Sequence, residues 1–109
     1  MANLRNQVEF AATLTRELPN LSMSGVLELC RFLVRAEATL HRLSETAGNR
    51  ELTLPELRRE ARLMTRVREA GARHGLGVTF NSDPRGAAIY LRLPSGRSND
   101  WGGRGWAVP

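Results

Sequence analysis

The last third of the chain, residues 75–109, reads GLGVTFNSDPRGAAIYLRLPSGRSNDWGGRGWAVP. It holds both tryptophans, seven of the ten glycines and three of the five prolines. Glycine and proline at this density mark turns between short strands, whereas the preceding residues have the apolar spacing of helices. The sequence therefore predicts an α+β fold, with three N-terminal helices packed on a small two- or three-stranded antiparallel C-terminal sheet.

Apolar and polar residues alternate on both sides of residues 83–86 and predict the two arms of a hairpin. Asp83-Pro84-Arg85-Gly86 has proline and glycine where a type I turn accepts them. Residues 106–108 predict a short third strand. The expected inward-facing side chains are Val78, Phe80, Ile89, Leu91 and Leu93.

The helix before the hairpin has the clearest boundaries. Thr53 and Glu56 form a capping box, with Pro55 in the first turn. At the other end, His74-Gly75 predicts a glycine C-cap. The residues expected to face the core are Leu57, Ala61, Met64, Val67 and Gly71.

Two further helices are predicted upstream. The first spans about residues 4–18, with Asn3 as N-cap, and its apolar face consists of Leu4, Val8, Phe10, Ala11, Leu14 and Leu18. The second begins near Ser22 or Ser24, ends around Thr46, and is apolar over more than half of its circumference. Its first apolar lobe holds Leu29, Phe32, Leu33, Ala36, Leu40 and Leu43, and its second holds Leu27, Val34 and Ala38. Such a helix is the centre of a core or lends one lobe to a partner, so a homodimer through residues 24–46 is expected.

The bulk composition fits one domain, residues 1–109, divided into a helical part (1–74) and a hairpin with a Trp/Gly tail (75–109). The single cysteine, Cys30, excludes an internal disulfide and fits a reducing compartment. We expect neither a membrane span nor a signal peptide.

The net charge is +5, and all sixteen basic residues are arginine. Guanidinium groups bind phosphate and carboxylate bidentately, which indicates an anionic partner; biased codon usage is the alternative source of so much arginine. On the predicted third helix, five arginines fall within an arc of roughly 100°. These are Arg58, Arg59, Arg62, Arg66 and Arg73, with Arg68 outside the arc. One interpretation is a docking surface for an anion. The other is a solvated helix face whose positive charge is partly balanced by Glu56, Glu60 and Glu69.

The tail offers a second candidate. Arg97 and Arg104 flank Trp101 and Trp106, and with Arg85 at the hairpin tip they suit phosphate contact and base stacking. The tryptophans are also suited to covering the core of a small sheet.

The sequence holds few groups of residues that suit catalysis or metal binding. Glu37 and His41 lie four residues apart on the second helix, which suits an acid–base pair or a polar clasp. One cysteine and two histidines match no metal-ligand spacing. We expect no enzyme activity, no catalytic residue, no cofactor and no metal.

The residues from Gly75 onward resemble short bacteriophage- and prophage-encoded proteins of unassigned function. The matching residues are Gly75–Gly77, Asp83–Gly86, Leu91–Gly96 and Trp101–Pro109. The resemblance covers about the last third of the chain and carries no activity. It implies a small accessory protein in the cytoplasm of a bacterial host that acts on host or phage machinery.

Two functions follow from these patterns. In the first, the chain is a non-enzymatic binding protein, an inhibitor or regulator, whose arginine-rich helix grips an acidic protein surface. In the alternative, it is a winged-helix-like DNA- or RNA-binding module with the hairpin as wing.

Overall fold

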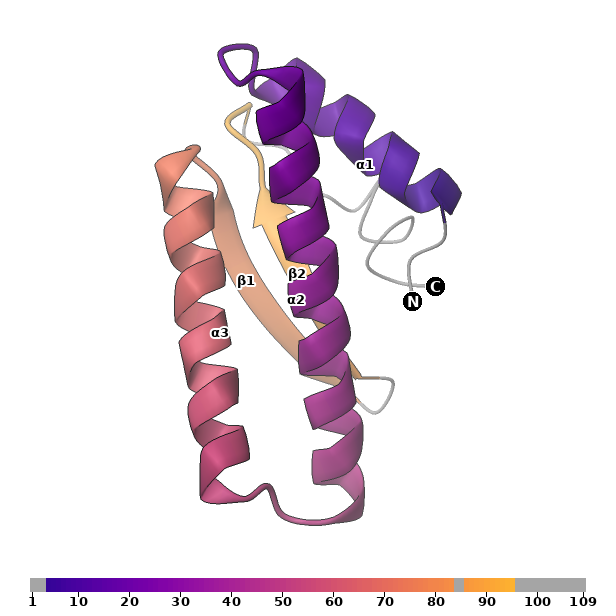
Figure 1. Cartoon of the computed structure of the whole chain (residues 1–109), viewed down its shortest axis with the longest axis vertical. Helices are drawn as coiled ribbons and strands as arrows, with labels where there is room; N and C mark the ends of the chain where they lie inside the picture. Colours follow the sequence, from indigo (N-terminus) through magenta and orange to yellow (C-terminus); the bar gives the residue numbers. More distant parts are fainter. Residues whose placement is uncertain (1–3, 84–85, 96–109) are drawn as a thin grey trace.

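The computed structural model describes residues 4–83 and 86–95, with side chains described for residues 8–80 and 89–95. Three helices precede two strands: α1 (Leu4–Glu17), α2 (Met23–Asn49), α3 (Leu54–Arg73), β1 (Gly77–Asp83) and β2 (Gly86–Arg92). The strands form an antiparallel hairpin that lies behind the long helices α2 and α3, while α1 flanks the upper half of α2 (Figure 1). The predicted α+β class is confirmed, whereas the third strand at residues 106–108 and the cap at Asn3 lie outside the described residues.

Local hydrogen bonding explains where the helices begin and end. The Ser22 side chain caps α2 by accepting from the Gly25 N–H at 3.1 Å, which confirms the earlier of the two predicted starts. The predicted end near Thr46 was wrong, because α2 continues to Asn49 and the Arg50 N–H still bonds the Thr46 carbonyl at 2.9 Å. The first helix ends at Glu17, one residue before the prediction.

Both predicted caps of α3 are confirmed. The Glu56 carboxylate accepts from the Thr53 N–H at 2.8 Å, and the Glu56 N–H donates to the Thr53 hydroxyl at 3.4 Å. At the other end, Gly75 has a φ of 73°, a left-handed conformation that favours glycine. Two bonds from the residues after the helix, Gly75 N–H to Ala72 and Leu76 N–H to Gly71, satisfy its last carbonyls.

Two glycine substitutions should have opposite effects on stability. Gly75→Ala places a side chain at positive φ and is expected to lower the free energy of unfolding by about 1 kcal/mol. Gly48→Ala is the matched control, because Gly48 is helical and no atom lies within 4 Å of an added Cβ, so a gain of about 0.5 kcal/mol or more is expected. Chemical denaturation measures both, and equal shifts would contradict the left-handed cap.

The core lies between α2 and the hairpin. Leu33, Ile89 and Leu91 are at most 1% exposed, and β2 packs on α2 while β1 packs on α3. This confirms the predicted inward strand side chains, with Val78 and Phe80 only partly buried.

Three residues that were predicted to face the core are exposed, so those predictions are wrong. Val8 is 60% exposed because α1 buries only the side that carries Phe10 and Leu14. Leu57 is 47% exposed because the first half of α3 extends beyond the hairpin (Figure 1). Ala61, one turn later, is exposed for the same reason. The core side of α3 therefore begins at the half-buried Leu63 and Met64 and becomes fully buried at Val67 and Gly71.

Candidate functional site

The five predicted arginines of α3 share one exposed side of that helix. The buried side is set by Val67, Ala70 and Gly71, which face α2 and the hairpin. At 100° per residue the arginines project away from it. All five are exposed: Arg58, Arg59, Arg62, Arg66 and Arg73.

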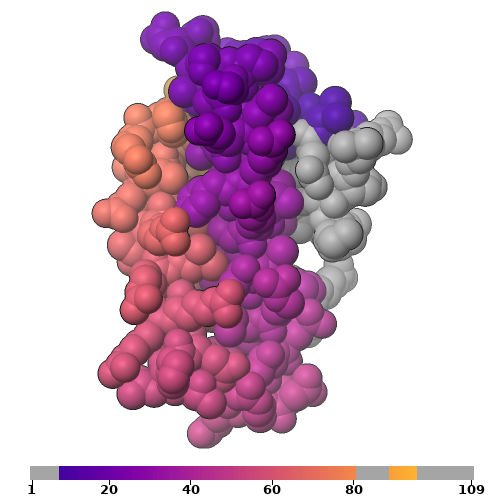
Figure 2. Space-filling model, in the orientation of Figure 1, coloured from indigo at the N-terminus to yellow at the C-terminus, as the bar shows by residue number. Residues whose placement is uncertain are grey.

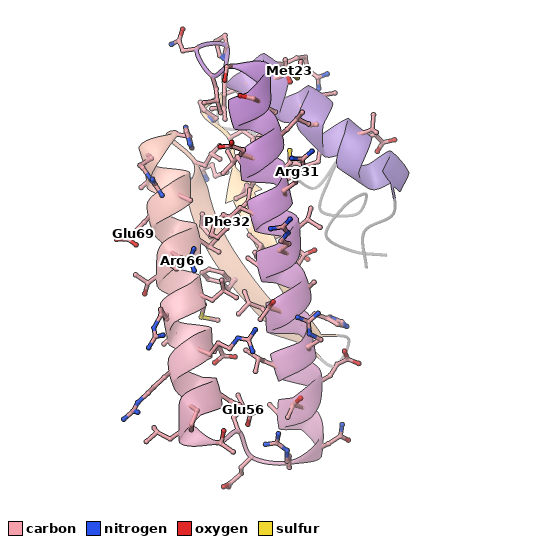
Figure 3. The ribbon with its side chains drawn as sticks, in the orientation of Figure 1. Met23, Arg31, Phe32, Glu56, Arg66 and Glu69 are labelled. Atoms are coloured by element: carbon pink, nitrogen blue, oxygen red, sulfur yellow. The ribbon has the colours of Figure 1, made fainter. Side chains whose placement is uncertain are left out.

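Aromatic contacts fix how this side is oriented. The Arg66 guanidinium lies 5.6 Å from the centre of the Phe32 ring, which belongs to α2 (Figure 3). Arg68 lies 4.9 Å from the centre of the Phe80 ring, which belongs to β1. The arginine row therefore flanks the seam between α2 and α3 on the side away from the sheet, and Arg68 lies on the sheet side, outside the predicted arc.

A second row of arginines lies on α2. Arg31, Arg35 and Arg42 are spaced four and seven residues apart, so they lie along one side of the helix, opposite the buried Leu33. Figure 3 shows Arg31 on the same side of the molecule as Arg66. We call the two rows together the arginine face: Arg31, Arg35 and Arg42 of α2 with Arg58, Arg59, Arg62, Arg66 and Arg73 of α3.

Carboxylates do not neutralise this face. Among residues 8–80 and 89–95, no carboxylate oxygen lies within 4.0 Å of any of its eight guanidinium groups. Glu56 instead accepts two hydrogen bonds of 2.9 Å from Arg50, which lies between the helices. This contact and the Thr53 N–H hold the pKa of Glu56 down at about 2. Glu56 therefore bonds Arg50 and the start of α3 and no guanidinium group of the arginine face.

The two rows flank a seam that is visible in Figure 2 as the boundary between α2 and α3. Phe32 and Leu63 are half-buried there. Exposed Glu28 and Glu69 are the acidic residues that helical spacing places on the same side as the arginines. The face is therefore strongly basic, with isolated negative charges and with apolar side chains in the seam.

Glu37 does not pair with His41, so the predicted pairing was wrong. The Glu37 carboxylate accepts from the Ile89 N–H at 3.0 Å, whereas His41 Nε2 lies 3.3 Å from the Glu45 carboxylate. Glu37 is 8% exposed, and this burial raises its pKa from 4.5 to about 8, although the Ile89 bond lowers it in part. The Glu37 side chain therefore links α2 to β2 through a buried hydrogen bond.

The described part of the chain offers few other side chains that suit catalysis or metal binding. Burial raises the pKa of the Cys30 thiol to about 11, so it stays protonated at neutral pH. His74 is the C-cap of α3, as expected of a helix-terminal histidine. Within the described ranges, three metal-ligating side chains do not come together, and each helix is too short or too polar for a bilayer span.

The tail candidates cannot be placed on this surface. The side chains of Arg85, Arg97, Arg104, Trp101 and Trp106 lie outside the described residues. Conversely, Arg31, Arg35 and Arg42 were not among the predicted site residues. The signal that could have joined them to the third helix was the four-residue connection, 50–53, which brings two long helices side by side in antiparallel orientation.

No protein-family model matches the chain, and no curated protein or solved structure matches it either. The resemblance to short phage-encoded proteins stays a prediction.

Proposed function

We propose that the chain is a non-enzymatic binding protein that docks on an acidic protein surface through the arginine face. The observation that supports this most is the convergence of eight exposed guanidinium groups from two helices, none of them paired with a described carboxylate. Like charges held together on one surface repel each other, and an anionic partner relieves that repulsion. Guanidinium also binds carboxylates bidentately, so the surface suits acidic side chains.

The charge pattern favours a protein partner over a nucleic acid. Glu28 and Glu69 lie among the arginines and would repel phosphates, whereas a protein surface can offer basic side chains opposite them. The helices also differ from a helix-turn-helix, in which two helices cross at about 90–120°. Here α2 and α3 have 27 and 20 residues and lie side by side (Figure 1).

The resemblance of the last third supports a biological context for this proposal. We infer an accessory protein of phage or prophage origin, acting as an inhibitor or regulator of host or phage machinery in the bacterial cytoplasm. Self-association through α2 remains part of the proposal: in its second lobe Leu27 is 38% exposed and Val34 and Ala38 are half-buried. Light scattering that reports a strict monomer would remove that part.

A double charge reversal tests the docking surface. With fluorescent polyglutamate as the acidic polypeptide in about 0.15 M salt, we expect Arg62→Glu/Arg66→Glu to weaken binding by about tenfold or more. The free energy of unfolding should change by no more than about 1 kcal/mol, because both side chains are exposed and Arg66 loses only its contact with Phe32.

The matched control is Arg16→Glu/Arg92→Glu, which changes the net charge equally at two exposed positions outside the arginine face. It should weaken binding by less than about threefold, as expected from a long-range effect alone. Equal losses for both variants would mean that net charge, not this face, attracts the polyanion. Duplex DNA is measured in parallel, and binding to DNA without binding to polyglutamate would favour the nucleic-acid alternative.

A further inference from the structure

We propose that the segment recognised by the arginine face is an acidic α-helix that lies along the seam between α2 and α3, across Phe32. This inference rests on the proposed function and names the shape of its partner. It draws on three observations: the spacing of the two arginine rows, the apolar side chains between them, and the lack of fully buried residues at the connected end of the helices.

The spacing of the rows matches a helix. Arg59, Arg66 and Arg73 recur every seven residues along α3, which corresponds to about 10.5 Å between neighbours. Arg35 and Arg42 repeat the same interval on α2. A partner helix lying parallel to the seam presents carboxylates at the same interval on each of its two flanks, so both rows can be paired at once. The phosphates of a duplex instead curve away from two straight rows.

Two apolar side chains lie in the floor of the seam. Phe32 and Leu63 are half-buried there, and Arg66 lies over the Phe32 ring. Rows of charge on either side of an apolar strip form the complement of an amphipathic acidic helix, whose apolar residues would cover Phe32 while its carboxylates reach the arginines. Burial of an aromatic ring with an arginine stacked on it is typical of residues that dominate binding energy.

The connected end of the two helices has no fully buried residue of its own. From residue 44 to residue 66 every side chain is exposed or half-buried, and Leu52, Leu63 and Met64 belong to the half-buried group. Few buried contacts hold this end, so α2 and α3 can adjust their separation at low cost. A third helix on the seam would add contacts that this end lacks.

Two synthetic peptides of equal composition test the shape of the partner. In the in-phase peptide, glutamates lie at seven-residue intervals on both sides of a leucine stripe; in the scrambled peptide, the same residues are distributed around the helix. We expect the in-phase peptide to bind about tenfold more tightly at about 0.15 M salt, as measured by fluorescence anisotropy.

A pair of aromatic variants provides the matched control. Phe32→Ala should weaken the in-phase peptide by about fivefold or more, whereas Phe80→Ala, which removes the other arginine-stacked ring on the sheet side, should leave it within about twofold. Thermal unfolding of both variants shows whether each remains folded at the temperature of the binding assay. A variant that does not is replaced by Phe32→Leu or Phe80→Leu, with the same ordering expected.

The outcomes separate the two proposals. Equal binding of the in-phase and scrambled peptides overturns the helix inference but leaves an acidic partner in place. The helix inference is also overturned if neither acidic peptide binds, or if Phe32→Ala and Phe80→Ala weaken binding equally. If polyglutamate does not bind either, the proposed function itself is overturned.

Discussion

The free energy of unfolding should fall as the pH rises from about 5 to about 8, because Glu37 releases its proton in the unfolded chain before it does so in the fold. The buried carboxyl has its pKa raised from 4.5 to about 8. A group with a raised folded-state pKa contributes stability that is fully present below the unfolded pKa and is lost as the pH rises through the folded pKa. The expected slope is about 1.4 kcal/mol per pH unit, or roughly 3 to 5 kcal/mol across the window.

The Glu37→Gln variant should remove this dependence. Glutamine keeps an oxygen that accepts from the Ile89 N–H but carries no titrating proton. The variant is therefore expected to be more stable than the natural chain near pH 8 and of similar stability near pH 5, in urea denaturation at each pH.

Glu60→Gln is the control for this experiment, because Glu60 is a less buried carboxylate on α3. The pH slope of that variant should match the natural chain. An unchanged slope in Glu37→Gln would show that another group titrates and would contradict a raised pKa for the buried Glu37.

Leu33→Ala is expected to lower the free energy of unfolding by about 2 to 5 kcal/mol. Leu33 is 0% exposed at the centre of α2, where the core between the helices and the hairpin is formed. The truncation leaves a cavity that the surrounding side chains fill only in part. Since small domains are stabilised by about 5–15 kcal/mol, the loss is a large share of the total.

Leu54→Ala removes the same atoms from a leucine that is 58% exposed at the first position of α3. Its cost should stay within about 0.5 kcal/mol. Comparable costs at the two positions, in parallel chemical denaturation, would contradict the placement of the core.

Features set by nearby residues could be predicted from the sequence. The capping box of Thr53 and Glu56 and the left-handed Gly75 depend on contacts within a few residues, and both are confirmed. The hairpin register, with Asp83 opposite Gly86, also agrees with the predicted turn position. The sequence patterns therefore yielded most of the element order.

Features set by tertiary contacts could not be predicted. Val8 and Leu57 have the spacing of core residues, yet no element covers them in the described structure. Glu37 has its partner 52 positions away, on β2, and helical spacing alone suggested His41 instead. A helical wheel gives the side on which a residue lies but not what packs against that side.

The candidate site also combines a part that could be predicted from the sequence with a part that depends on tertiary contacts. The arc on α3 was predicted from spacing, because all five arginines belong to one helix. Its extension onto α2 depends on the antiparallel arrangement of two helices and on which side of each faces the hairpin. That arrangement turns two solvated strips into one basic surface around Phe32.

NMR can show directly where an acidic polypeptide binds the folded protein. Polyglutamate is titrated into isotope-labelled protein, and the arginine Nε–Hε signals and backbone amide signals are followed by NMR. We expect the largest shifts at Arg31, Arg35, Arg59, Arg62 and Arg66 and at Phe32. Largest shifts at Arg16 and Arg92, or equal shifts at all exposed arginines, would contradict a docking surface on α2 and α3.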